Sequence, residues 1–182
     1  MLSRVFRVIV CMVIVPLSLL IFLSCKTPFH SKGQAIETKD LVPKDNETIG
    51  WSRDGEMIYC EDLVCLAALI DGAAPYYIEG GAAKIIFQDY VKSAENIHAS
   101  LEIYQTKNPY QAQALYMGAS AISPVAVENL GESGRIDQGL VGFYRVETYK
   151  KNFFIRLVTM DKSEPLKNEI LEFVKNIVSK IP

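Results

Sequence analysis

Cys60 and Cys65 are the two residues of this chain whose type and spacing most directly predict a covalent bond. An even pair of cysteines in an oxidising compartment predicts a disulfide, and two buried free thiols are the alternative. Bridged cysteines have Cα atoms about 4.4 to 6.8 Å apart, so a pair with this spacing inside one continuous helix would be too distant. A bond therefore requires Cys60 to precede the helix that contains Cys65. The C-x4-C spacing also differs from the C-x-x-C of thiol oxidoreductases, which argues against a catalytic redox role.

The two histidines and the acidic residues predict no catalytic or metal site. His30 lies in a polar stretch near the N-terminus, and His98 lies on a predicted strand beside no serine that the pattern can place. A Ser-His-Asp triad needs both partners, so we expect no catalytic residue. Cys60, Glu61 and Asp62 form a weak cluster of metal-ligating types, but the preference for negative charge at the start of a helix explains the two acids better. No glycine cluster fits a dinucleotide or P-loop motif, and we expect neither a metal nor another cofactor.

Five residues near a predicted helix end form the candidate ligand-binding site: Asp71, Gly72, Tyr76, Tyr77 and Glu79. They combine an acid, a flexible turn and two aromatic rings. Tyrosines beside a carboxylate could bind a sugar, a peptide or a cationic group. The alternative is structural: Gly72 caps the helix, Asp71 accepts from turn amides and the tyrosines pack on the sheet.

The first 25 residues predict export. Arg4 and Arg7 precede an uncharged apolar run of about sixteen residues, shorter than the roughly 20 that cross a bilayer, so residues 1–24 are typical of a signal peptide. The ending, Phe22-Leu23-Ser24-Cys25, resembles the lipobox of bacterial lipoproteins, in which the cysteine is diacylated and becomes the mature N-terminus. The resemblance implies lipidation of Cys25 and anchoring in the inner or outer membrane. The alternative is an uncleaved anchor helix in which Cys25 is an ordinary thiol.

Charge and length limit the rest to one domain without a nucleic-acid partner. The full chain has 19 Lys and Arg against 21 Asp and Glu, and loss of residues 1–24 removes two of the positive charges. Binding to nucleic acid would need a basic face, so that class of partner is excluded. Residues 25–40 are polar, lack apolar periodicity and predict a tether. Residues 41–182 then suffice for one domain with a sizeable core.

Apolar periodicity predicts the elements of this domain. The strands are expected at 84–92, 97–106, 140–148 and 153–160, and the helices at 63–70, from Asn108-Pro109 and from Ser163. Leu63, Leu66, Ala67 and Ile70 share one face, so we expect the first helix to be mostly buried. Val125 to Gln138 is expected to be loop-rich with one short strand. Because strands and helices do not alternate regularly, we predict an α+β domain with a mainly antiparallel sheet and helices packed on it.

The chain also resembles a family of uncharacterised secreted and lipid-anchored bacterial proteins, a domain of unknown function. The family pattern appears here as Leu41-Val42-Pro43, Gly50-Trp51, Ile70-Asp71-Gly72-Ala73-Ala74 and Tyr77, within a match over residues 41–180. Pro75 stands where the family often has an acidic residue, and Lys151-Asn152 replaces a hairpin glycine. The resemblance implies a fold and an export route, and no reaction.

Together these features predict a membrane-anchored lipoprotein of the cell envelope that binds a small molecule or a protein. The membrane is expected to be a partner only through the N-terminal lipid. An envelope enzyme of unknown reaction and a purely structural role are the alternatives.

We predict that Cys25 is the lipidated N-terminus of the mature protein, because the basic start, short apolar run and Ser24-Cys25 ending have no other common explanation. Mass spectrometry of membrane-extracted protein should find a chain that begins at an acylated Cys25. Cys25→Ser should abolish both the added mass and the membrane association. A mature chain that begins elsewhere would contradict the prediction.

Overall fold

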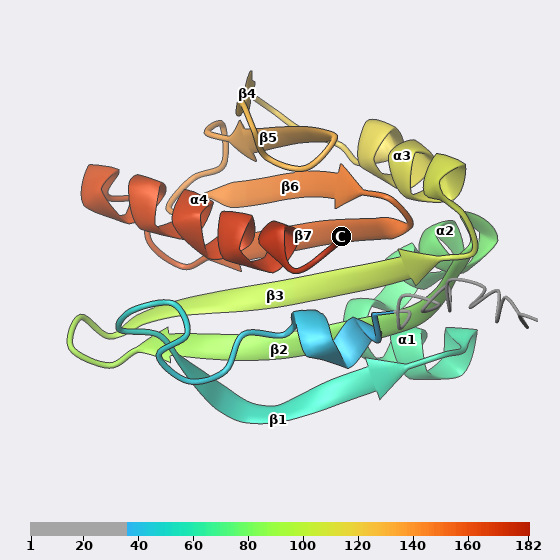
Figure 1. Cartoon of the computed structure of the whole chain (residues 1–182), viewed down its shortest axis with the longest axis horizontal. Coiled ribbons are helices and arrows are strands. Elements are labelled where there is room, and N and C mark those ends of the chain that lie inside the picture. Colours follow the sequence, from blue (N-terminus) through green and yellow to red (C-terminus); the bar gives the residue numbers. More distant parts are fainter. Residues whose placement is uncertain (1–35) are drawn as a thin grey trace, which may run out of the picture. The chain divides into compact units, whose positions relative to one another are not determined.

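One antiparallel sheet organises the part of the chain that the structure describes, residues 36–182 of a computed structural model (Figure 1). Its seven strands are β1 (Ser52–Cys60), β2 (Ala82–Lys92), β3 (Ile97–Thr106), β4 (Pro124–Ala126), β5 (Ser133–Asp137), β6 (Arg145–Lys150) and β7 (Phe153–Thr159). Their order across the sheet is β1-β2-β3-β7-β6-β5-β4, and every neighbouring pair is antiparallel. The predicted signal peptide, Cys25 and His30 lie outside the described residues.

Helices cover both faces of this sheet. The helical elements are η1 (Thr38–Leu41), α1 (Leu63–Ile70), η2 (Asp71–Ala73), α2 (Ala74–Glu79), α3 (Pro109–Gly118) and α4 (Glu164–Ser179). Figure 1 shows α4 lying across the sheet, while α1, α2 and α3 gather at one end of it. Two separate apolar cores result, one under α4 and one under α1 to α3. The predicted α+β class, with a mainly antiparallel sheet and helices packed on it, is confirmed.

The alternation in β3 separates the two cores. Ile97, Ala99, Leu101 and Ile103 are buried on the α4 side, as their period of two predicts. Tyr104 points to the opposite side and is buried in the second core. Each of the central strands therefore contributes buried side chains to both cores.

Helix α4 supplies an aromatic ring to the centre of the first core. Phe173 is fully buried and meets Trp51 and Tyr90 edge-on, with ring centroids 5.8 and 4.9 Å away. The Tyr90 hydroxyl donates to the Pro43 carbonyl at 2.8 Å, which fixes the segment before β1. The 3.6-residue apolar spacing of α4 thus marks a true core face, as the sequence predicts.

Helix α1 departs from prediction. Leu66 is buried, but Leu63 and Leu69 are partly exposed and the Val64 side chain is 82% exposed. The helix follows edge strand β1 and packs mainly on α2 and η2, so no layer covers its outer side. Apolar spacing identified an apolar face without showing that the fold supplies a partner for it.

Four further features differ from expectation. Strand β1 was not predicted, because an exposed edge strand containing Gly55 and several charges lacks alternation. Thr38 is buried and its hydroxyl donates to the Gln105 side chain, so the domain includes residues expected in the tether. Asp71, with φ of 48°, ends α1 in place of Gly72. The stretch expected to hold one short strand contains two, β4 and β5.

Phe173→Ala should lower the free energy of unfolding by about 3 to 5 kcal/mol, because the fully buried ring leaves a cavity between two aromatic neighbours. In urea, a chain that begins at Lys26 should show a lower midpoint with a nearly unchanged slope. Glu172→Ala, an exposed change on the same helix, serves as the control. Equal midpoints for the two variants would contradict the packing described here.

Candidate functional site

The five residues of the predicted binding site do not converge. Tyr77 is buried, stacks on Tyr104 with centroids 4.3 Å apart, and its hydroxyl accepts from Arg156 Nη1 at 2.7 Å. The Tyr76 hydroxyl donates to the Leu115 carbonyl at 3.2 Å and so joins α2 to α3.

The other three predicted residues, Asp71, Gly72 and Glu79, lie on the surface. Asp71 ends a helix, which is a structural role. The contacts of these side chains thus follow the structural alternative, and the groove described below is lined by none of the five.

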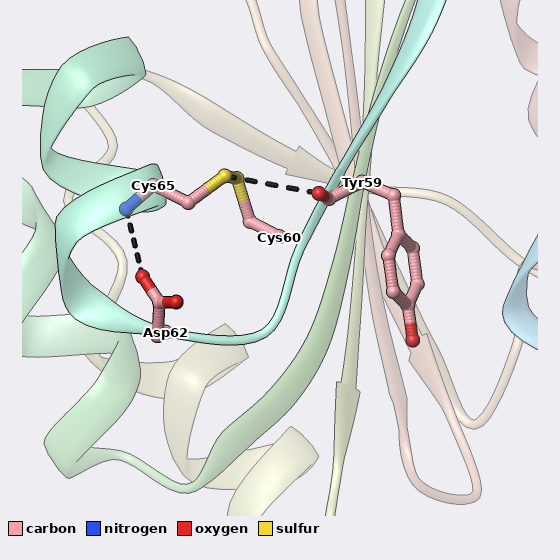
Figure 2. The surroundings of a disulfide bond; sticks show 4 residues. All are labelled: Tyr59, Cys60, Asp62 and Cys65. Carbon is pink, nitrogen blue, oxygen red and sulfur yellow. Dashed lines mark hydrogen bonds between the residues drawn. A yellow bond between two sulfur atoms is a disulfide. The ribbon is translucent and has the colours of Figure 1, made fainter.

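A disulfide joins the end of β1 to the first turn of α1 (Figure 2). Cys60 precedes the helix, as a bond requires, and the two Cα atoms lie 5.5 Å apart. Asp62 caps α1 by accepting from the Cys65 backbone N–H at 2.8 Å. The Cys65 sulfur also lies 3.7 Å from the Tyr59 carbonyl oxygen, a contact only, since a disulfide sulfur has no hydrogen to donate. The Tyr59 ring points away from the disulfide, and its hydrogen bond to Glu61 raises the pKa of Tyr59 to about 12.

A ladder of alternating charges crosses the sheet on the side of α1 to α3. Its members, in register on adjacent strands, are Glu102, Arg156, Glu147 and Arg135. Arg156 Nη1 lies 3.1 Å from Glu102 and its Nε lies 2.9 Å from Glu147, while Arg135 Nη2 lies 2.6 Å from Glu147. Burial opposes the charge of Arg156, but the neighbouring carboxylates outweigh it and raise its pKa above the usual value. Opposite charges directly across strands stabilise their pairing.

The ladder also fixes the helices on this side. Arg135 Nη2 donates to the carbonyls of Tyr116 and Ala119 at 3.1 and 2.7 Å, where α3 ends. Arg156 holds Tyr77 of α2. The ladder is therefore a structural network whose donors are already used within the fold.

Asp137 anchors the turn between α3 and β4. Its carboxylate accepts from the backbone N–H groups of Ile122 and Ser123 at 2.9 Å and of Gly139 at 3.0 Å, and pairs with Arg145 at 3.0 Å. Burial alone would raise the pKa of Asp137, but these bonds outweigh it and bring the pKa to about 2.

Two polar pairs lie on the open part of the same face. His98 Nδ1 is 3.5 Å from Asp54 Oδ2, and Ser100 Oγ donates to Asp89 Oδ1 at 2.5 Å. Among the hydrogen bonds of residues 36–182, none joins His98 to Ser100, so the nucleophile–base contact of a triad is lacking here. Within the same described range, no three His, Cys, Asp or Glu side chains gather as a metal site. No helix in that part of the chain has the length and apolarity needed to cross a membrane.

A groove of about 800 Å³ lies between the outer side of α4 and the segment that leads into β1. The segment contributes Glu47, Thr48, Ile49, Gly50 and Trp51, β2 contributes Lys92, and α4 contributes Asn168, Glu169, Glu172, Lys175, Asn176 and Ser179. Ile49 stands out on one side with 91% of its side chain exposed. Trp51 is only 1% exposed, because it also packs on Phe173. The groove therefore has an exposed apolar residue, Ile49, at its rim and a buried aromatic residue, Trp51, in its lining.

Two buried polar atoms at this groove lack partners. Neither Thr48 Oγ1 nor Trp51 Nε1 has a hydrogen-bond partner within residues 36–182. A buried donor left unpaired costs about 1 to 3 kcal/mol, so two on one groove are unusual. The indole N–H can only donate, so its partner must be a hydrogen-bond acceptor.

The charged side chains of the groove are paired with one another. Lys92 Nζ lies 2.7 Å from Glu169, Lys175 Nζ lies 2.7 Å from Glu172, and Glu47 lies 2.6 Å from Lys180. Hydrogen bonds with Glu169 and Glu95 raise the pKa of Lys92 above its usual value, so it stays charged at neutral pH. Two residues that line the groove therefore each have a buried polar atom without a partner in the described part of the chain, while the charged side chains of the groove are paired.

The sequence reading missed this groove. In the sequence, Trp51 stands out only through the Gly50-Trp51 pair of the family pattern. The one indication in the sequence is Ile49, a large apolar residue in the run Thr48-Ile49-Gly50-Trp51 that belongs to no periodic element. The facing residues come from the polar side of α4, which periodicity assigns to solvent.

Asp137→Asn should lower the free energy of unfolding by about 2 kcal/mol at pH 6. The pKa of Asp137 is lower in the folded protein than the value near 3.9 in the unfolded chain, so its ionised carboxylate stabilises the fold above that pH. That part of the stability is lost as the pH falls toward about 2, where the native carboxylate is protonated as well. The difference in free energy of unfolding between the parent and Asp137→Asn, measured in urea, should therefore shrink by ~2 kcal/mol from pH 6 to pH 2.5. Glu128→Gln, at an exposed acid, is the control. A pH-independent difference would contradict the assignment.

Comparison of the chain with protein-family models and with curated proteins gave no match. Among solved structures, it is similar to the extracellular domain of PknH from Mycobacterium tuberculosis. The two are 15% identical, with 80% of this chain and 91% of the other covered at a TM-score of 0.47. We take neither function nor partner from a likeness of this degree.

Proposed function

We propose that this protein is an exported, lipid-anchored binding module of the bacterial cell envelope whose ligand lies in the groove over Trp51. The signal-like start and the lipobox-like Cys25 support export and anchoring. The disulfide between Cys60 and Cys65 fits an oxidising compartment. The observation that carries the binding role is the pair of buried donors without partners, Thr48 Oγ1 and Trp51 Nε1, at one groove.

The chemistry of the groove selects a class of ligand. Since the charges of Lys92, Lys175 and Glu47 are each neutralised within the fold, a charged ligand would gain no free partner there. The exposed Ile49 side chain gains from contact with an apolar surface. The indole N–H of Trp51 calls for a hydrogen-bond acceptor. We therefore propose a neutral, largely apolar ligand that carries a carbonyl or similar acceptor.

Prodan, a neutral naphthyl ketone whose emission shifts to shorter wavelength in apolar surroundings, is a suitable probe. It should bind saturably and quench Trp51 by energy transfer, which reports the groove directly because Trp51 is the only tryptophan of the chain. Thr48→Val removes one unpaired hydroxyl and Ile49→Ser removes the apolar rim. Each should weaken binding about 5- to 10-fold, the equivalent of one hydrogen bond or a small apolar contact.

Ile122→Ser is the matched control, since Ile122 is also a strongly exposed isoleucine but lies beside β4. Its affinity for Prodan should equal that of the parent. Absence of saturable energy transfer from Trp51, or equal affinities in all four proteins, would refute the groove as the binding site.

A further inference from the structure

The outer side of α1 is an apolar surface that the fold leaves uncovered. The helix carries no charged residue from Leu63 to Ile70, and Leu66 is its one buried side chain. Val64 is 82% exposed, and Leu63, Ala67 and Ala68 are exposed on the same side of the helix. Contiguous exposed apolar residues on a stable element mark an interaction surface.

A disulfide and an N-cap hydrogen bond fix the position of the first turn of this helix. The Cys60–Cys65 disulfide ties its first turn to the end of β1, and Asp62 caps its N-terminus.

The described chain begins at the same end of the sheet as α1, on the face that α4 covers. The Glu37 carboxylate pairs with Lys84 Nζ at 3.4 Å, and the next residue along β2, Ile85, lies opposite Cys60 in register. Cys60 is bonded to Cys65 of α1, so the start of the domain and α1 lie at the same end of the sheet (Figure 1). Ten residues lie between Cys25 and Ile36. Even fully extended, they span at most about 40 Å.

We infer that α1 lies against the membrane in which Cys25 is anchored, with Leu63 and Val64 contacting lipid. This inference rests on the proposed lipid anchor, which keeps the bilayer within reach of this end of the domain. The occupant is the bilayer surface, because the anchor supplies it at high local concentration. Glu61, Asp62 and Asp71 flank the helix, so zwitterionic lipid suits the contact and anionic lipid opposes it.

The test uses the full, lipidated chain in phosphatidylcholine vesicles, with a tryptophan added at α1. Val64→Trp places an indole on the inferred contact, and Val141→Trp places one on a loop that is 92% exposed and precedes β6, at the opposite end of the sheet. Trp51 is kept in both proteins and in the parent as a buried common background. Each protein is compared in vesicles with plain and with brominated acyl chains, since bromine quenches indoles that enter the lipid.

The added emission of Val64→Trp should fall about two-fold in brominated vesicles, as for a side chain inserted at the interface, while Val141→Trp and the parent change little. Co-sedimentation with the vesicles is measured first, beside Cys25→Ser. Parent protein that fails to sediment would refute the lipid anchor and the inference together. Protein that sediments with equal quenching at the two sites would refute the inference alone. An unquenched short-wavelength emission from Val64→Trp would also refute it, by placing a second copy of the chain on α1.

Discussion

The carboxylate of Glu147 is the charge around which one whole side of this domain is arranged. It is fully buried and lies between the guanidinium groups of Arg135 and Arg156, with Arg145 Nε 3.6 Å away. Removing one partner of such a buried pair typically costs about 3 to 5 kcal/mol, because the remaining charge is left without compensation. Through the same arginines, the ladder holds the end of α3 and Tyr77 of α2. The position of the helix layer on that side thus depends on a polar network in the sheet.

The opposite side follows a different rule. There α4 covers the sheet with apolar side chains, and Trp51 and Tyr90 close on Phe173 by edge-on contacts. The groove arises where this packing leaves Trp51 buried but its nitrogen unpaired. On the polar side, Arg135 and Arg156 donate to groups within the fold, although Arg145 Nε is buried there without a hydrogen-bond partner among the described residues. On the α4 side, Thr48 and Trp51 each have a buried polar atom without a partner within residues 36–182 and also line a groove, which is why we place binding there.

Sequence periodicity predicted the helices and strands that have one face packed on another element and the other face more exposed to solvent. Strand β3 and helix α4 are such elements, and both were found where expected. Edge strand β1 has one neighbour and little burial, so it carries no pattern. The helix at 63–70 was found where expected, but its predicted burial was wrong, because burial depends on neighbours that only the topology supplies. The pairing of Glu147 with Arg135 and Arg156 on the two neighbouring strands is likewise set by register, which no single strand encodes.

That the groove over Trp51 binds a neutral ligand through an acceptor is tested most directly by one NMR signal. Because Trp51 is the only tryptophan, its indole N–H gives a single side-chain indole peak in a two-dimensional proton–nitrogen spectrum. When Prodan saturates the protein, the account predicts that this proton moves to higher frequency, as an N–H does on gaining a hydrogen bond to a carbonyl. An indole peak that stays in place while peaks elsewhere in the domain shift would contradict it.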